Sequence, residues 1–200
     1  WAFPSAMALS RTAAVVLEWL ITNPEGRVLY SNLPCRKRVM ENKILLVDDE
    51  ADILETIEEI LEESKVDTAR DYQSASQKIK KRKYDLAILD IMGVDGLKLL
   101  EETVDRGIPT VMLTAYALTP EALEKSIKLG AVSFLPKEKM SELDDFLADV
   151  VLKGGQPAWG KLFDKLGGFF NKHFGPDWKQ RNQFFKEFEE SLQGGKQEDS

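Results

Sequence analysis

The sequence predicts an α/β fold, a doubly wound five-stranded parallel sheet, with a C-terminal amphipathic helical extension. Short apolar runs within residues 44–136 alternate with segments of helical periodicity, which is typical of buried parallel strands and crossover helices. Polar residues end four of these runs, at Asp48–Asp49, Asp90, Thr114 and Lys137. Because a parallel sheet opens its ligand crevice beyond the carboxyl ends of its strands, these four positions should converge there.

The strands are expected in the four apolar runs and in one weaker segment between the first two. In chain order they are Ile44–Val47, Val66–Arg70, Leu86–Leu89, Val111–Leu113 and Val132–Pro136. The alternation with helices implies right-handed crossovers, which produce a doubly wound sheet.

The helices are predicted from apolar spacing and from capping residues. After Asp49 an apolar stripe recurs at helical spacing, with glutamates on the opposite face. The later helices are expected at Ala75–Arg82, Gly96–Val104, Pro120–Leu129 (opened by Thr119–Pro120) and Met140–Leu152 (opened by Ser141).

The tail changes character after a flexible hinge at Lys153–Pro157. Residues 154–193 are predicted to form a helical hairpin broken at Gly175–Asp177, and residues 194–200 to be disordered. Its aromatic faces comprise Trp159, Leu162, Phe163, Leu166, Phe169, Phe170 and Phe174, then Trp178, Phe184, Phe185, Phe188 and Leu192. A hairpin this short cannot bury so many aromatics by itself, so it should pack on the α/β domain, a second copy, a partner or a membrane surface.

The N-terminal residues 1–39 are expected to be an extension outside the α/β domain, which should span residues 40–153. Ile21–Asn32 has a strand-turn-strand pattern that resembles the opening of a PAS sensor domain. A complete PAS domain needs about a hundred residues to bury a core, so this segment is either a fragment or non-native sequence.

Charge and composition exclude several classes of protein. The net charge of −7 comes from residues 40–152, which carry 14 basic and 25 acidic side chains. So acidic a domain repels nucleic acid, and binding to DNA is disfavoured. The single cysteine, Cys35, fits a reducing compartment, and no apolar stretch reaches the ~18 residues of a membrane span. We therefore expect a cytoplasmic protein, although residues 12–22 faintly suggest a signal peptide.

The residue types at the predicted crevice indicate metal and phosphoryl chemistry. Repulsion among three clustered carboxylates makes it unfavourable for all of them to stay ionised unless a cation lies beside them. Hard oxygen ligands suit Mg²⁺. An ionised aspartate can also attack phosphorus and form an aspartyl phosphate.

The same residues resemble the receiver domain of two-component response regulators. The resemblance lies in Val47-Asp48-Asp49-Glu50, Leu89-Asp90-Ile91-Met92 with Asp95-Gly96, Leu113-Thr114-Ala115, and Gly130-Ala131 leading to Pro136-Lys137, and it covers roughly residues 41–152. It implies a flavodoxin-like receiver fold with strand order 2-1-3-4-5. It also implies an Mg²⁺-dependent phosphoprotein in a phosphorelay. We expect no DNA-binding or enzymatic output domain.

Site roles follow from the resemblance. Asp90 would be the phosphoacceptor and a metal ligand, with Asp49 ligating Mg²⁺ directly, Asp48 through water and Met92 through its backbone carbonyl. Thr114 and Lys137 would contact the acyl phosphate. Phe134 falls at a switch position or is simply core, whereas Met92 and Tyr116 flank the phosphoryl group or lie on the surface.

Two departures from the family pattern affect this site. The loop after Asp90 is about two residues shorter than usual and lacks the customary Met-Pro, which puts metal affinity and phosphoryl lifetime in question. Glu138 replaces a proline after Lys137, so this peptide bond should be trans, because a cis bond without proline costs ~3 kcal/mol.

The function expected from the sequence is phosphorylation of Asp90 that switches protein contacts. The expected partners are a sensor histidine kinase or phosphotransfer protein and an unidentified downstream protein. A homodimer through the tail or the fourth-helix face stays open. Two alternatives are a receiver-like docking scaffold that is not phosphorylated and an Asp-nucleophile phosphatase, although that enzyme would want an acid where Met92 stands.

Overall fold

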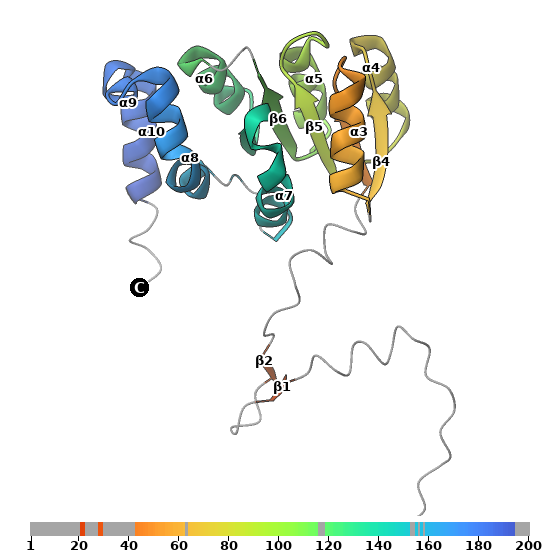
Figure 1. The fold of residues 1–200 in the computed structure, drawn as a ribbon, viewed down its shortest axis with the longest axis horizontal. Helices are drawn as coiled ribbons and strands as arrows, with labels where there is room; N and C mark the ends of the chain where they lie inside the picture. The colour runs from red at the N-terminus through yellow and green to blue at the C-terminus, as the bar shows by residue number, and fades with distance from the viewer. Residues whose placement is uncertain are drawn as a thin grey trace, which may run out of the picture.

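The chain contains a five-stranded parallel sheet in the order β4-β3-β5-β6-β7, of which Figure 1 labels β4, β5 and β6. This computed structural model describes residues 21–22, 28–29, 43–62, 64–115, 119–152, 155, 157 and 159–194. The strands are β3 (Lys43–Val47), β4 (Lys65–Ala69), β5 (Leu86–Asp90), β6 (Thr110–Thr114) and β7 (Ser133–Pro136). The order confirms the predicted 2-1-3-4-5 arrangement.

Helices cover both faces of the sheet. They are α3 (Ala51–Ile60), α4 (Tyr72–Lys81), α5 (Gly96–Val104), α6 (Pro120–Lys128) and α7 (Leu143–Leu152). Right-handed crossovers bring α4, α5 and α6 to one face, and Figure 1 shows α3 and α7 in front of the other. β5 and β6 are buried along their full length, which explains why their sequences are apolar without alternation.

Two predicted helix starts were wrong. The second helix begins at Tyr72, three residues early, because the Asp71 carboxylate accepts a hydrogen bond from the Ser74 backbone N–H at 2.8 Å and caps it. Ser141 opens no helix. Instead a 3₁₀ helix, η1 (Lys137–Glu142), directly follows β7 and contains Ser141. It continues into α7, which begins at Leu143.

The tail forms three helices, α8 (Trp159–Phe174), α9 (Trp178–Arg181) and α10 (Gln183–Gly194). The break falls at the predicted Gly175–Asp177, and the short α9 is additional to the predicted hairpin. The buried apolar side chains of the tail are Trp159, Leu162, Phe163, Leu166, Phe170, Trp178 and Phe185, and they join the core of the α/β domain. The tail lies beside α6 and α7 (Figure 1), so it packs on the α/β domain, one of the arrangements that the sequence left open.

Near the N-terminus, β1 (Ile21–Thr22) pairs antiparallel with β2 (Val28–Leu29), which agrees with the expected strand-turn-strand pattern. The other residues before Lys43 lie outside the described part of the chain, so the PAS-like fragment stays a prediction. Among the described helices, none has the length and apolarity needed to cross a membrane.

Candidate functional site

Three carboxylates meet at the carboxyl ends of β3 and β5. Asp48 and Asp49 follow β3, and Asp90 is the last residue of β5. One carboxylate oxygen from each lies within 4.8 Å of the others. Asp48 and Asp90 are buried, whereas Asp49 is exposed at the mouth of the cluster. The parallel topology therefore brings together the three carboxylates predicted from the sequence.

Lys137 supplies the positive charge of this cluster from the end of β7. Its Nζ lies 2.7 Å from Asp48 Oδ2, 2.8 Å from Glu50 Oε1 and 3.2 Å from Asp90 Oδ1. The Lys137 side chain is itself buried. Glu50 was not among the predicted site residues. Its position directly after two aspartates was the only sequence signal that it could belong to the site. The contact between Glu50 and Lys137 depends on the Lys137 rotamer, which the sequence does not give.

The pKa values reflect burial opposed by ion pairing. Burial raises the pKa of Asp90 to about 6, with Asp48 and Asp49 adding to the rise and Lys137 opposing it. Burial also raises the pKa of Asp48 against the effect of Lys137. Burial lowers the pKa of Lys137, but the nearby carboxylates of Asp48, Glu50 and Asp90 outweigh this effect, and the net shift is upward. At neutral pH, Asp90 is therefore mostly ionised beside a protonated lysine.

One oxygen of the cluster lacks a well-directed hydrogen bond. Asp48 Oδ2 is fully buried, and its close contact with Lys137 Nζ falls outside hydrogen-bond geometry. Among the side chains that the structure describes, such buried, unsatisfied oxygens are rare, because they are costly. Three carboxylates that each offer an oxygen within 4.8 Å of the others form a set of hard ligands, and it is this donor set that fits a divalent cation such as Mg²⁺.

The loop that follows β5 closes tightly over Asp49. Gly93 has φ +66°, and a Cβ at this position would lie 2.3 Å from Asp49 Oδ1. A Cβ on Gly96 would lie 1.8 Å from the Asp90 carbonyl oxygen, so α5 begins in backbone contact with Asp90. Neither glycine was predicted to shape the site as it does here, because positive φ and close approach are not evident from the sequence.

The cluster opens into a cavity of about 210 Å³. Its lining residues are Asp49, Glu50, Asp90, Met92, Gly93, Ala115 and Lys137. This volume is several times the roughly 30 Å³ that one water molecule occupies. The cavity therefore has room for a phosphoryl group and a hydrated ion.

The remaining predicted residues lie in different surroundings. Met92 is exposed at the cavity rim, and its carbonyl oxygen accepts a hydrogen bond from the Val94 N–H at 2.5 Å, so its role as a metal ligand stays a prediction. Thr114 is buried at the end of β6, opposite Pro136 of β7. Phe134 is completely buried, while Tyr116 lies outside the described residues.

The peptide bond between Lys137 and Glu138 is trans, as predicted from the absence of proline. Lys137 nevertheless reaches both Asp48 and Asp90. Replacement of the usual proline by Glu138 therefore does not remove the lysine from the site.

Residues 44–148 match the sequence model described as the response regulator receiver domain. The matched segment is more than half of the chain and contains all the clustered carboxylates and Lys137. The chain therefore belongs to the response regulator receiver family of two-component systems.

Similar curated proteins include the response regulator protein PilR of Pseudomonas aeruginosa, 37% identical over 101 residues (48% of this chain, 22% of that protein). A protein-glutamate methylesterase/protein-glutamine glutaminase of Vibrio cholerae is 39% identical over 104 residues (48% of this chain, 28% of that protein). This chain thus spans a quarter or so of these relatives, and the esterase name describes that larger protein.

Solved receiver structures have the same fold. The signal receiver domain of an HD domain-containing protein from Pseudomonas fluorescens superposes with a TM-score of 0.53 at 25% identity, over 57% of this chain and 97% of that one. The chemotaxis protein CheY4 of Vibrio cholerae gives a TM-score of 0.50 at 28% identity, over 55% and 98%. Both cover a little more than half of this chain.

Proposed function

We propose that the chain is a cytoplasmic phosphoacceptor response regulator whose Asp90 receives a phosphoryl group and thereby switches protein contacts. The carrying observation is the position of Asp90, buried between Lys137 and two other carboxylates at a cavity. The donor would be a sensor histidine kinase or a phosphotransfer protein, and the receiver would span residues 40–153.

The chemical step is a nucleophilic displacement at phosphorus. A carboxylate oxygen of Asp90 forms a bond to phosphorus while the bond from phosphorus to the donor's leaving atom breaks, and that atom keeps the electron pair. Lys137 would pair with the phosphoryl oxygens as a fixed point charge. The Thr114 hydroxyl would donate a hydrogen bond to the acyl phosphate. Later attack by water on phosphorus would return the carboxylate and inorganic phosphate.

The carboxylates of Asp48, Asp49 and Asp90 would hold Mg²⁺, with the Met92 carbonyl as a further ligand. When bound, the ion would neutralise charge on the transferring phosphoryl oxygens. The exposure of Asp49 favours direct ligation of a hydrated ion at the mouth, and the complete burial of Asp48 favours a supporting role.

The test is phosphorylation with acetyl phosphate and Mg²⁺, followed by intact-mass analysis. We expect one added phosphoryl group, which Asp90→Asn abolishes. Asp95→Asn provides a matched control, since Asp95 lies on the same loop but pairs with Lys98 at 2.8 Å, outside the carboxylate cluster. A phosphoryl mass that is still added to Asp90→Asn would refute the assignment of Asp90 as the phosphoacceptor. Sustained phosphate release would favour the phosphatase, and absence of both would favour the docking scaffold.

A further inference from the structure

A second cavity lies before the amino ends of β5 and β6. Because the strands are parallel, this edge of the sheet is opposite the carboxylate cluster. The loops that enter β5 and β6 line this basic pocket with Arg82, Lys83, Tyr84, Arg106, Gly107 and Ile108. Its volume of about 340 Å³ is in the size range of small-molecule pockets. A Cβ on Gly107 would meet no atom within 4 Å, so this side of the pocket is open.

Two cations of the basic pocket have no carboxylate partner. Lys83 and Arg106 are both exposed, and neither side chain makes a hydrogen bond or an ion pair with any residue that the structure describes. By contrast, Lys179 in the tail places its Nζ 2.7 Å from Glu189. The pocket therefore carries two uncompensated positive charges, although the α/β domain as a whole is strongly acidic.

The third cation is held in place by an ion pair. Arg82 Nη1 lies 2.6 Å from Asp67 Oδ2 on β4, and the same oxygen accepts a hydrogen bond from the Tyr84 hydroxyl at 2.8 Å. A guanidinium has five N–H donors in one rigid plane, so Arg82 keeps others for an anion. Asp67 cancels its charge but orients its donors. Asp85 and Asp105, the carboxylates adjacent in sequence, do not line the pocket.

Basic residues at a helix C-terminus also have a purely structural explanation. Residues 78–83 read Lys-Ile-Lys-Lys-Arg-Lys where α4 ends, and the partial negative charge of a helix C-terminus favours cations there. This effect explains Lys80 and Lys81 in the last turn. It does not require Lys83 and Arg106, which follow two different helices, to border one cavity.

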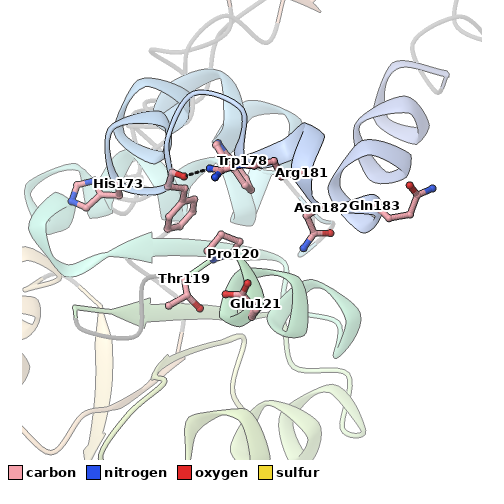
Figure 2. A pocket seen from close by; sticks show the side chains of 9 residues that line it. Thr119, Pro120, Glu121, His173, Trp178, Arg181, Asn182 and Gln183 are labelled. Atoms are coloured by element: carbon pink, nitrogen blue, oxygen red, sulfur yellow. Dashed lines mark hydrogen bonds between the residues drawn. The ribbon is translucent and has the colours of Figure 1, made fainter.

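The larger groove between the tail and α6 offers a useful comparison. It has a volume of about 740 Å³, and Figure 2 shows Arg181 and Asn182 among the residues that line it. Arg181 Nη2 donates a hydrogen bond to the Phe174 carbonyl at 2.7 Å, and Asn182 Nδ2 donates one to Glu124 Oε2 at 2.8 Å. These polar groups are engaged within the fold, whereas Lys83 and Arg106 are available to a ligand.

We propose that the basic pocket binds a linear phosphate chain, such as a triphosphate, through Lys83 and Arg106, with Arg82 as a further donor. Ammonium and guanidinium groups make charge-assisted hydrogen bonds to phosphate oxygens. Cations on two separate loops suit neighbouring phosphates of one chain. An enclosed hollow of this size also suits a small anion better than an extended acidic peptide.

The source of the phosphate chain is either an inorganic polyphosphate or a nucleoside triphosphate. The Tyr84 ring is buried and its hydroxyl is engaged by Asp67, so no aromatic face of the pocket is exposed for stacking on a base. The phosphate chain is therefore the recognised part in both cases. This inference does not depend on phosphorylation of Asp90, because the pocket is at the other edge of the sheet.

The test is calorimetric titration of the full chain with tripolyphosphate and, separately, with ATP. The buffer is freed of divalent cations, so that no metal bridges phosphate to the carboxylate cluster. We expect one site and affinities for the two probes within about 3-fold, since charge-assisted contacts to phosphate dominate. Lys83→Gln and Arg106→Gln should each weaken tripolyphosphate binding roughly 10-fold, and Asp90→Asn should leave it unchanged.

Lys81→Gln is the matched control. Lys81 belongs to the same basic run, is exposed and does not line the pocket, so its replacement makes the same change in net charge. Its effect on affinity should stay within about 2-fold, because salt screens exposed charges that do not touch the ligand. Lys83 and Arg106 are exposed and lie outside the helices, so urea unfolding should show that their variants keep the fold.

Four results would overturn the proposal. Absence of tripolyphosphate binding would exclude the site. Equal losses in Lys81→Gln and Lys83→Gln would show diffuse attraction by the basic run. Binding of ATP without tripolyphosphate would mean that the nucleoside is recognised. A tetraglutamate peptide that binds more tightly than tripolyphosphate would point to an acidic protein partner instead.

Discussion

Gly93→Ala should reduce the stability that the fold gains from Mg²⁺. Gly107→Ala is the matched control, because its backbone conformation is nearly the same. Gly93 has φ +66° and Gly107 has φ +69°, so an alanine at either position costs about 1–2 kcal/mol of folding free energy. The two differ in surroundings: a Cβ on Gly93 would lie 2.3 Å from Asp49 Oδ1, whereas a Cβ on Gly107 meets no atom within 4 Å.

The consequence for Mg²⁺ follows from the mobility of Asp49. This exposed side chain can rotate away from the new methyl group at little cost to folding, but its carboxylate then leaves the cluster. At a Mg²⁺ concentration of about 100 Kd, binding stabilises the folded state by about 2.7 kcal/mol, and a tenfold weaker Kd leaves about 1.4 kcal/mol.

The assay is urea unfolding of both variants with and without Mg²⁺, with Asp49→Ala setting the lower limit of the response. Both glycine variants should lose similar stability without metal. Gly107→Ala should keep the full Mg²⁺ increment, and Gly93→Ala should lose at least half of it. Equal increments in the two variants would refute the argument that Gly93 holds Asp49 in a ligating position.

Two further predictions concern Asp90 and the tail. Because the folded-state pKa of Asp90 is about 6 against an ordinary 3.8, its contribution to stability is present below pH 4 and lost as the pH rises through 6. Metal-free Asp90→Asn should thus be more stable than the wild type by up to about 3 kcal/mol at pH 7.5, with the difference gone at pH 4 in urea unfolding; a constant difference would contradict this. Phe170→Ala removes a completely buried ring and should lower the opening free energy of α8–α10 by about 3–5 kcal/mol in hydrogen exchange. An equal loss in β5 would show that the tail and the sheet unfold as one unit.

The sheet and its polar strand ends could be predicted because they depend on regular patterns. β5 is buried on both faces and therefore lacks alternation, and parallel topology places Asp48 and Asp90 at the same edge of the sheet. The strand order came from resemblance to the receiver family, since spacing does not determine which strands are neighbours.

Features set by rotamers or local backbone geometry could not be predicted in the same way. The ion pair between Glu50 and Lys137 joins residues 87 positions apart and depends on side-chain direction. The early start of α4 depends on Asp71, whose side-chain cap overrides the weak apolar pattern that follows it. The docking side of the tail was left open because its aromatic face suits any apolar surface, and the Asn182 contact with Glu124 is visible only in the fold.

The loop after Asp90 also limits which substitutions this receiver can acquire. Ile91 and Val94 are buried, and Gly93 and Gly96 have no room for a side chain. Asp95 has a left-handed backbone with φ 54° that disfavours branched residues. Met92, with 56% of its surface exposed at the cavity rim, is left as the position most open to mutation. Substitutions in this loop, whether natural or from a directed library, should therefore concentrate at residue 92, where a change of side chain alters access to Asp90 without disturbing the backbone that holds it.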